Sequence, residues 1–253
     1  MAGHSKWANI KRQKARVDAV KGKVFAKMSR EIIVAARSGA DPAANFQLRT
    51  AIDKAKAAGI PNDNIDRAIA KGSGQLNDGN ELEAIRYEGY GAGGIAILIE
   101  ALTDNRNRTA ADLRSAFTKN GGNLGETGCV SWMFDHKGVV TITGVVDEDE
   151  LLEASVEGGA EYYEMISEDD FQGTEVFTET TNLENLSQVL QEKGFNVTEV
   201  EFRWMSNNTV EVTDPEQARS LLKLMDALDD LDDVQNVTAN FDMANELIAG
   251  ALV

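Results

Sequence analysis

The sequence predicts an α+β protein in which an N-terminal three-helix domain is followed by two ferredoxin-like α/β domains, one inserted in the other. Apolar residues before Gly72 recur at helical spacing, and a polar, glycine-rich stretch at 72–80 then breaks this pattern. Beyond that stretch, short strands and helices follow one another in the order strand, helix, strand, strand, helix, strand, twice over. A chain of 253 residues is also near the upper limit for one hydrophobic core.

The first domain is expected to span residues 1–74. Residues 1–20 contain few large apolar side chains, so we expect a mobile arm or an incipient helix there. Three helices should follow, and the Asp41-Pro42 pair predicts an N-cap and a first helical residue for the second of them. The first helix should begin near Lys21 and end at Gly39, and the second should end at Gly59. Ile60-Pro61 then breaks the chain, and Asn62 or Asp63 can cap the third helix.

The remainder is expected to form an outer α/β domain from residues 81–135 and 207–253, and an inserted α/β domain from residues 136–206. The inserted domain should contain strands at 139–143, 162–166, 175–180 and 197–204, with helices at 148–156 and 183–192. The outer domain should contain strands at 94–102, 130–134, 209–212 and 234–241, with helices at 109–119 and 215–228, the latter capped by Asp214. A further strand at 85–90 is expected as an addition to the sheet edge.

Charge is distributed very unevenly along the chain. Residues 1–30 contain nine Lys or Arg and a single acid, Asp18, in a protein of net charge −17. Residues 1–74 carry a net charge of +9, which leaves −26 for the rest. Because the Debye length is about 8 Å at physiological salt, distant acids do not cancel this local positive field. The sequence therefore predicts that the N-terminal domain binds a polyanion.

The predicted contacts are the cations of the arm and of the first helix, with an aromatic side chain that could stack on a base or cap the helical core. They are Lys6, Trp7, Lys11, Arg12, Lys14, Arg16, Lys21, Lys23, Lys27 and Arg30. The segment Thr103–Thr109 contains Arg106 and Arg108, and two interpretations of it are equally supported. The arginines form a second phosphate contact, or the segment is only a loop with Asn107 or Arg108 near a helix cap.

Other chemistries find little support in the residue types. Gly89–Gly94 matches G-x-G-x-x-G, but a strand follows it, so a hairpin turn is favoured over a nucleotide site. His4, His136 and Cys129 lack metal-ligand spacing, and the acidic clusters 147–150 and 229–233 are interpreted as solvated faces. We expect no cofactor and no metal. An enzyme with a pocket between the α/β domains remains the third alternative.

No apolar run reaches the roughly 18 residues of a membrane span, and no apolar stretch follows the basic start as in a secretory signal. We therefore expect a cytoplasmic protein that is a monomer and makes no membrane contact. The acidic domains could bind a protein partner.

Several ordered motifs resemble the YebC/PmpR family over essentially the whole length. They are Gly3-His4-Ser5-Lys6-Trp7 with Asn9-Ile10-Lys11, Lys21-Gly22-Lys23, Arg30-Glu31-Ile32, Ile60–Ile65 with Arg67-Ala68-Ile69, Thr103-Asp104-Asn105 with Asn107-Arg108-Thr109, and Ser131-Trp132-Met133-Phe134. The resemblance implies a helical N-terminal domain with two α/β domains, and a non-enzymatic regulator of gene expression. The family is described as probable DNA-binding transcriptional regulators, and it includes a mitochondrial translational activator and members linked to the ribosome.

The nucleic acid itself stays open between two alternatives. A transcriptional regulator would place a helix in a DNA groove, whereas a translation factor would contact ribosomal RNA through its shape and phosphates. The sequence has no clear helix-turn-helix spacing, which slightly favours RNA.

Overall fold

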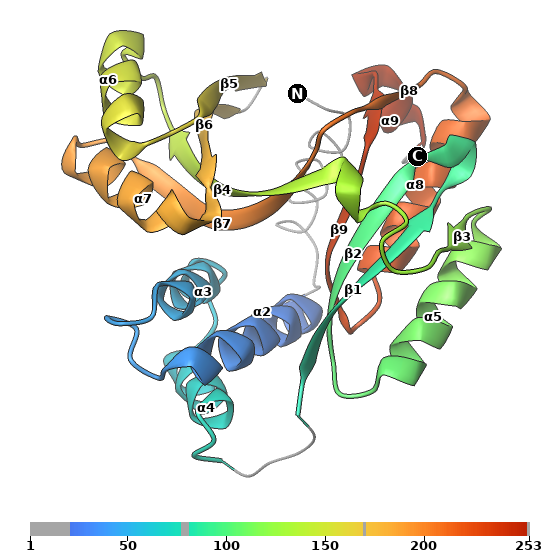
Figure 1. The fold of residues 1–253 in the computed structure, drawn as a ribbon, viewed down its shortest axis with the longest axis horizontal. Coiled ribbons are helices and arrows are strands. Elements are labelled where there is room, and N and C mark those ends of the chain that lie inside the picture. Colours follow the sequence, from blue (N-terminus) through green and yellow to red (C-terminus); the bar gives the residue numbers. More distant parts are fainter. Residues whose placement is uncertain (1–20, 77–80, 169–170, 252–253) are drawn as a thin grey trace. The chain divides into compact units, whose positions relative to one another are not determined.

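A computed structural model describes residues 21–76, 81–168 and 171–251, and the chain divides into two compact units (Figure 1). Unit 1 comprises Met1–Phe134 and Ser206–Val253, and unit 2 comprises Asp135–Met205. The fold class is confirmed: an N-terminal helical domain precedes antiparallel sheets that are covered by helices. The predicted ends of the insertion, 136 and 206, lie one residue from the ends of unit 2. The predicted arm lies outside the described residues.

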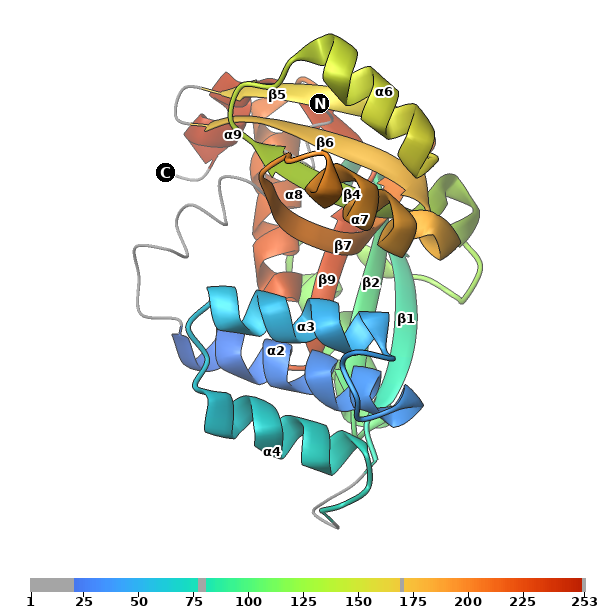
Figure 2. The ribbon, with the colours of Figure 1, turned by 90° about the vertical axis from the view of Figure 1, so that its left-hand side faces the viewer.

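The helical domain consists of α2 (Lys21–Ala35), the 3-10 turn η1 (Ala36–Ser38), α3 (Phe46–Ala57) and α4 (Asn62–Gly72). Figure 2 shows α2 lying between α3 and α4. Apolar residues at helical spacing close a small core, in which Ile32, Leu48 and Ala55 are fully buried. A side chain at Gly72 would collide with the carbonyl oxygen of Ile33, so the close approach of α4 to α2 requires glycine.

The second helix begins later than predicted. Asn45, rather than Asp41, is the N-cap of α3, because its Oδ1 accepts a hydrogen bond from the Leu48 amide at 3.0 Å. Its Nδ2 also donates to the carbonyl oxygens of Ala35 and Gly39, which fixes the cap against the preceding helix. Asp41 accepts from the Ala43 amide and so stabilises a turn instead.

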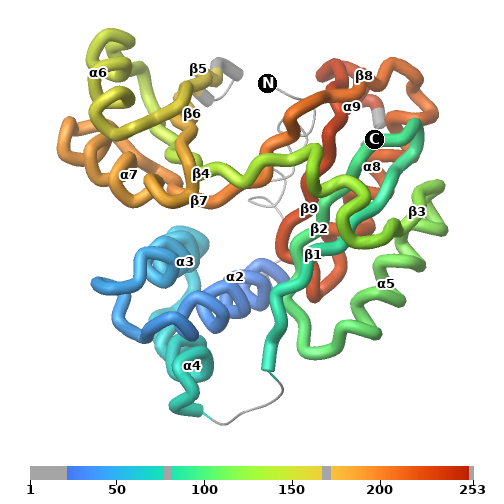
Figure 3. Tube along the Cα trace, viewed as in Figure 1, coloured from blue at the N-terminus to red at the C-terminus, as the bar shows by residue number. Residues whose placement is uncertain are grey.

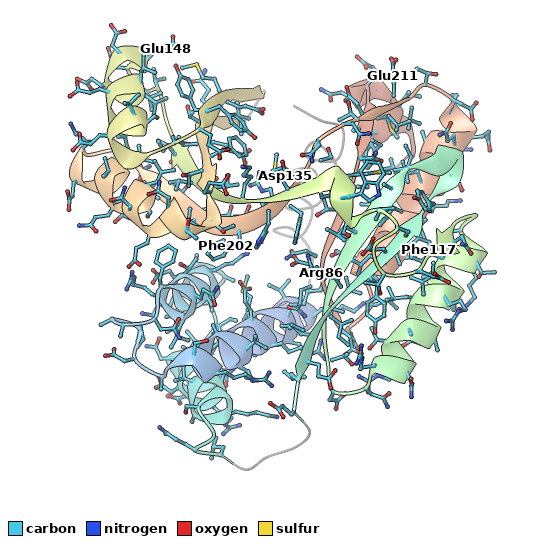
Figure 4. All side chains as sticks on the ribbon, in the orientation of Figure 1. Arg86, Phe117, Asp135, Glu148, Phe202 and Glu211 are labelled. Carbon is cyan, nitrogen blue, oxygen red and sulfur yellow. The ribbon has the colours of Figure 1, made fainter. Side chains whose placement is uncertain are left out.

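The outer α/β domain has a four-stranded sheet in the order β3-β1-β2-β9. Its elements are β1 (Glu83–Tyr90), η2 (Ala92–Gly94), β2 (Ala96–Thr103), α5 (Arg106–Lys119), β3 (Asn123–Leu124), α8 (Pro215–Asp229) and β9 (Val234–Ala239). Helices α5 and α8 lie on one side of the sheet (Figure 3), and their buried side chains pack with Ile97, Ile99 and Val237. Phe117 points from α5 toward the sheet (Figure 4), where Gly89 leaves room for its ring.

Three strand predictions for this domain are wrong in detail. β1 is a central strand, paired with β2 along its whole length and with β3 on its other side, and not an addition to the edge. β8 (Val210–Val212) lies outside the sheet and pairs in parallel with β10 (Phe241–Met243). Residues 131–133 form the 3-10 turn η3 (Ser131–Met133) instead of a strand. The sheet nevertheless keeps the ferredoxin-like spatial order, because β1 occupies the place expected for the strand at 209–212.

Unit 2 has the predicted ferredoxin-like topology, with the sheet order β5-β6-β4-β7. Its elements are β4 (Phe134–Thr143), α6 (Glu148–Gly158), β5 (Tyr162–Glu168), β6 (Phe171–Glu179), η4 (Thr180–Asn182), α7 (Leu183–Glu192) and β7 (Val197–Ser206). Gly138 and Gly158 allow close contact of β4 and α6 with Leu183 and Leu186 of α7. Helices α6 and α7 therefore cover the sheet face on which a Cβ atom at Gly138 would lie.

The opposite sheet face of unit 2 holds a half-buried ionic cluster. Arg203 donates to both carboxylate oxygens of Glu175 at 2.9 Å, and to Glu201 at 2.5 and 2.9 Å. Burial opposes the charge of the guanidinium, but the two carboxylates outweigh it and raise the pKa of Arg203. Register places Glu175 opposite Thr141 of β4. The charges of Arg203, Glu175 and Glu201 therefore compensate one another on this sheet face.

One further helix, α9 (Asn245–Ala251), was not anticipated from the sequence. It packs against α8, and its Ile248 is fully buried in the core of the outer domain.

Candidate nucleic-acid interface

Three predicted phosphate contacts of α2 face an acidic turn of the same unit. The Lys27 ammonium donates to Asp229, to the carbonyl oxygen at 2.8 Å and to Oδ1 at 3.0 Å. Lys23 donates to the carbonyl oxygen of Asp230 at 3.2 Å. Arg30 donates to the carbonyl oxygen of Asp232, and its Nη2 lies 3.6 Å from an Asp233 carboxylate oxygen. These cations lie within ion-pair distance of three of the four carboxylates in residues 229–233. The side chain of Lys21 lies outside the described residues.

Three other cations of the helical domain face solvent more freely. Lys56 in the last turn of α3 and Arg67 in α4 are exposed, and Lys71 near the end of α4 is half-buried. In the described part of the chain, no acidic side chain forms an ion pair with Lys56, Arg67 or Lys71. The net charge predicted for residues 1–74 includes these three cations, but they are not among the contacts predicted from the sequence. The signal that could have found them is their place on helix surfaces opposite the apolar stripe.

The predicted contacts of the arm lie outside the described residues. They are Lys6, Trp7, Lys11, Arg12, Lys14 and Arg16.

The two arginines of the β2–α5 connection differ in their surroundings. Arg108 Nη2 donates to Asp233 Oδ2 at 2.8 Å and to Asp104 Oδ1 at 2.9 Å, and these carboxylates raise the pKa of its guanidinium. Arg106 Nε lies 3.6 Å from Glu83, and the Arg106 side chain is 68% exposed. The helix starts at Arg106, earlier than predicted; its N-cap is Asn105, and Asn107 and Arg108 lie near this cap in the first turn. Arg106 alone of this pair leaves most of its side chain in solvent.

Asp233 is the centre of a buried polar cluster where β2, α5 and β9 meet. Its Oδ2 accepts hydrogen bonds from Thr103 at 3.1 Å, from Thr109 at 2.8 Å and from Arg108 at 2.8 Å. Burial would raise the pKa of this carboxyl, but the three donors outweigh it and lower the pKa. The prediction that residues 229–233 form a solvated face is therefore wrong for Asp233, which is 6% exposed.

A second buried carboxylate shapes the loop between β3 and β4. Glu88 of β1 accepts hydrogen bonds from the amides of Gly128 at 2.8 Å, Val130 at 2.6 Å and Ser131 at 2.8 Å. Burial opposes ionisation, yet these donors lower the pKa of Glu88. The loop displays Trp132, which is 68% exposed and donates its indole N–H to the Cys129 carbonyl oxygen. The faces of the Trp132 indole remain accessible to solvent or to a partner. This exposed aromatic side chain was not predicted from the sequence.

Other kinds of site find no support in the part of the chain that the structure describes. Gly89 and Tyr90 end β1, and residues 91–95 form the β1–β2 hairpin connection, as predicted, with Gly93 and Gly94 at φ values of 77° and 76°. No group of three or more His, Cys, Asp or Glu among the described residues is arranged to hold a metal ion. No described helix is both long and apolar enough to cross a membrane.

Comparisons with known proteins agree with this architecture. Family models described as "TACO1/YebC protein N-terminal domain" and "TACO1/YebC second and third domain" match residues 5–75 and 82–241. A "Probable transcriptional regulatory protein" of Trichodesmium erythraeum is 88% identical over 98% of each chain, and one of Gloeothece citriformis is 76% identical over the same shares. The crystal structure of a conserved hypothetical protein from Aquifex aeolicus superposes with a TM-score of 0.81 at 44% identity, and the match covers 91% of this chain and 94% of that one.

Proposed function

Because the chain belongs to the TACO1/YebC family, we propose that it is a nucleic-acid-binding regulator of gene expression, and in particular a DNA-binding regulator of transcription. The names of the relatives from Trichodesmium and Gloeothece describe transcriptional regulation and support this choice. The proposed activity is binding without catalysis, exerted in the cytoplasm. The polyanion is the nucleic acid, and the basic domain is the part that contacts it.

The observation that carries the proposal is the separation of charge. Residues 1–74 carry a net charge of +9 and the rest of the chain −26, so only the N-terminal basic domain attracts phosphate groups. On the described helices of that basic domain, Lys56, Arg67 and Lys71 have no ion pair with a described residue and can approach phosphates without breaking one. The arm adds five Lys or Arg residues and Trp7.

The described ion pairs divide the other predicted contacts into two groups. Lys23, Lys27 and Arg30 would have to leave the acidic turn 229–233 to reach a phosphate, and Arg108 would have to leave Asp233. Each such exchange replaces one charge interaction with another, so its net contribution to affinity is small. We therefore expect affinity to depend mainly on the arm and on Lys56, Arg67 and Lys71, with Arg106 as an accessory contact.

The test is the salt dependence of DNA affinity, measured by fluorescence anisotropy on the full chain. The triple variant K56E/R67E/K71E should weaken binding and reduce the slope of log affinity against log salt by about 3, because each lost phosphate contact removes about 0.9. Reversal of Lys11, Arg12, Lys14 and Arg16 to Glu should act in the same direction. The matched control is R114E/K119E/K223E, which makes the same charge change at exposed positions of the outer domain. An equal loss of DNA affinity in both triple variants would contradict the proposal that Lys56, Arg67 and Lys71 contact the phosphates.

The kind of nucleic acid is tested by competition. Genomic DNA fragments and purified ribosomes are offered together at physiological salt, and the bound DNA and RNA are sequenced. Enrichment of a few DNA sites would support transcriptional regulation. Retention on ribosomes with only diffuse DNA binding would refute it and support the alternative, a ribosome-binding translation factor.

A further inference from the structure

Unit 2 combines the strongest negative charge with most of the exposed apolar side chains. Residues 135–205 contain 18 Asp or Glu and three Lys or Arg, a net charge of −15. Seven large apolar residues are exposed in the described chain, and five of them lie in this unit: Val145, Leu152, Val156, Tyr162 and Met165. Exposed apolar side chains that gather on one part of a protein surface mark an interaction site.

Two of these residues form a stripe on α6. Leu152 and Val156 are one helical turn apart on the same side, and they are 51% and 72% exposed. The buried side of α6 is formed instead by Leu151, Ala154, Ser155 and Gly158. The stripe therefore has no partner within the described part of the unit that would bury it.

The stripe continues toward the edge strand β5. Glu148, one turn before Leu152, accepts a hydrogen bond from the Tyr163 hydroxyl at 3.3 Å, so this side of α6 faces β5. Figure 2 shows α6 beside β5. Met165 is two residues beyond Tyr163, hence on the same sheet face, and is 53% exposed. We call Leu152, Val156 and Met165 the α6 surface.

Carboxylates flank the α6 surface on both sides. Glu148 and Asp149 stand at the start of α6, and Glu153 and Glu157 lie beside the stripe on the side facing α7. Lys193 is the one described cation that pairs with this group, at 3.5 Å from Glu153 and 2.8 Å from Glu157. Four acids and a single lysine thus border the apolar stripe of Leu152 and Val156, on a helix about three turns long.

The charge pattern selects among possible occupants. A second copy of unit 2 would bring another −15 against the surface, while nucleic acid and anionic lipid would be repelled in the same way. A cationic amphipathic helix offers both required chemistries: apolar side chains over Leu152 and Val156, and Lys or Arg opposite the flanking carboxylates. We propose that the α6 surface docks a basic, amphipathic segment of a partner protein.

The probe is a fluorescently labelled synthetic peptide of about 16 residues, long enough for roughly four helical turns, with Leu on one face and Lys on the other. A second peptide has the same composition in an order that breaks the apolar face. Both are titrated against the full-length protein, its L152S/V156S variant and the control variant L76S, which removes an exposed leucine of the helical domain. Circular dichroism checks that each variant is folded.

The proposal predicts that the amphipathic peptide binds, that L76S leaves its affinity unchanged, and that L152S/V156S weakens it about tenfold or more, because two apolar contacts are lost. Added salt should weaken it as well, since the flanking carboxylates are exposed. Absence of binding, or equal affinity for the reordered peptide, would overturn the proposal. So would self-association of the wild-type chain that disappears in L152S/V156S, because the occupant would then be a second copy.

Discussion

Replacement of Glu88 by Gln should loosen the loop that displays Trp132. The carboxylate accepts three main-chain amides, two on Oε2 and one on Oε1. The amide of Gln offers one oxygen, so at least one N–H loses its acceptor and faces an NH₂ group instead. One lost charge-assisted bond and the weakening of the other two amount to about 3 kcal/mol.

The assay is native-state amide hydrogen exchange, followed at Val130 and Ser131. A local loss of about 3 kcal/mol should raise their exchange rates by roughly 100-fold, while amides in unit 2 remain unaffected. The control is E126Q, which makes the same chemical change at an exposed acid of the same loop.

The pH dependence of this protection follows from the lowered pKa of Glu88. A carboxyl whose pKa is lower in the folded protein contributes stability that is present above the unfolded pKa and is lost as pH falls through the folded pKa. Wild-type protection, relative to E88Q at each pH, should therefore decline in acid. If E88Q exchanged at the wild-type rate at neutral pH, Glu88 would not hold the loop.

Two other substitutions test the remaining buried charges. D233N should lower the free energy of unfolding of unit 1 by about 2–4 kcal/mol in urea denaturation, because Arg108, Thr103 and Thr109 lose their charged acceptor; the exposed D232N should have little effect, and equal shifts would argue against the cluster. R203M should destabilise unit 2 by about 3–5 kcal/mol, because Glu175 and Glu201 lose the guanidinium to which both are hydrogen-bonded. E175Q/E201Q added to R203M should restore much of the loss in thermal unfolding, and failure to do so would point to lost packing instead.

Elements whose signals are local could be predicted from the sequence. Helix α7 begins and ends at the predicted residues, and Asp214 caps α8 by accepting from the Gln217 amide, as expected. Periodicity and capping residues suffice there because both act within one or two helical turns.

Elements fixed by distant partners could not. The apolar run 130–134 reads as a strand, but Glu88, 42 residues away from Val130, accepts its amide and turns the chain. Lys27 reads as a free cation, yet its acceptor Asp229 is 202 residues away. A pattern within a short window carries no information about such partners, and these partners decide which candidate contacts remain available to a ligand.

The hydrogen bond between the Asn207 amide and the Met133 carbonyl oxygen, 2.8 Å long, closes unit 1 where unit 2 is inserted. Unit 2 is thus equivalent to one long loop whose ends are already joined. The entropy of closing a loop grows only with the logarithm of its length, and a folded insertion that brings its own ends together reduces that cost further. Unit 1 can therefore tolerate large changes in the length and composition of unit 2, and a short glycine linker joining residues 134 and 206 should preserve its core.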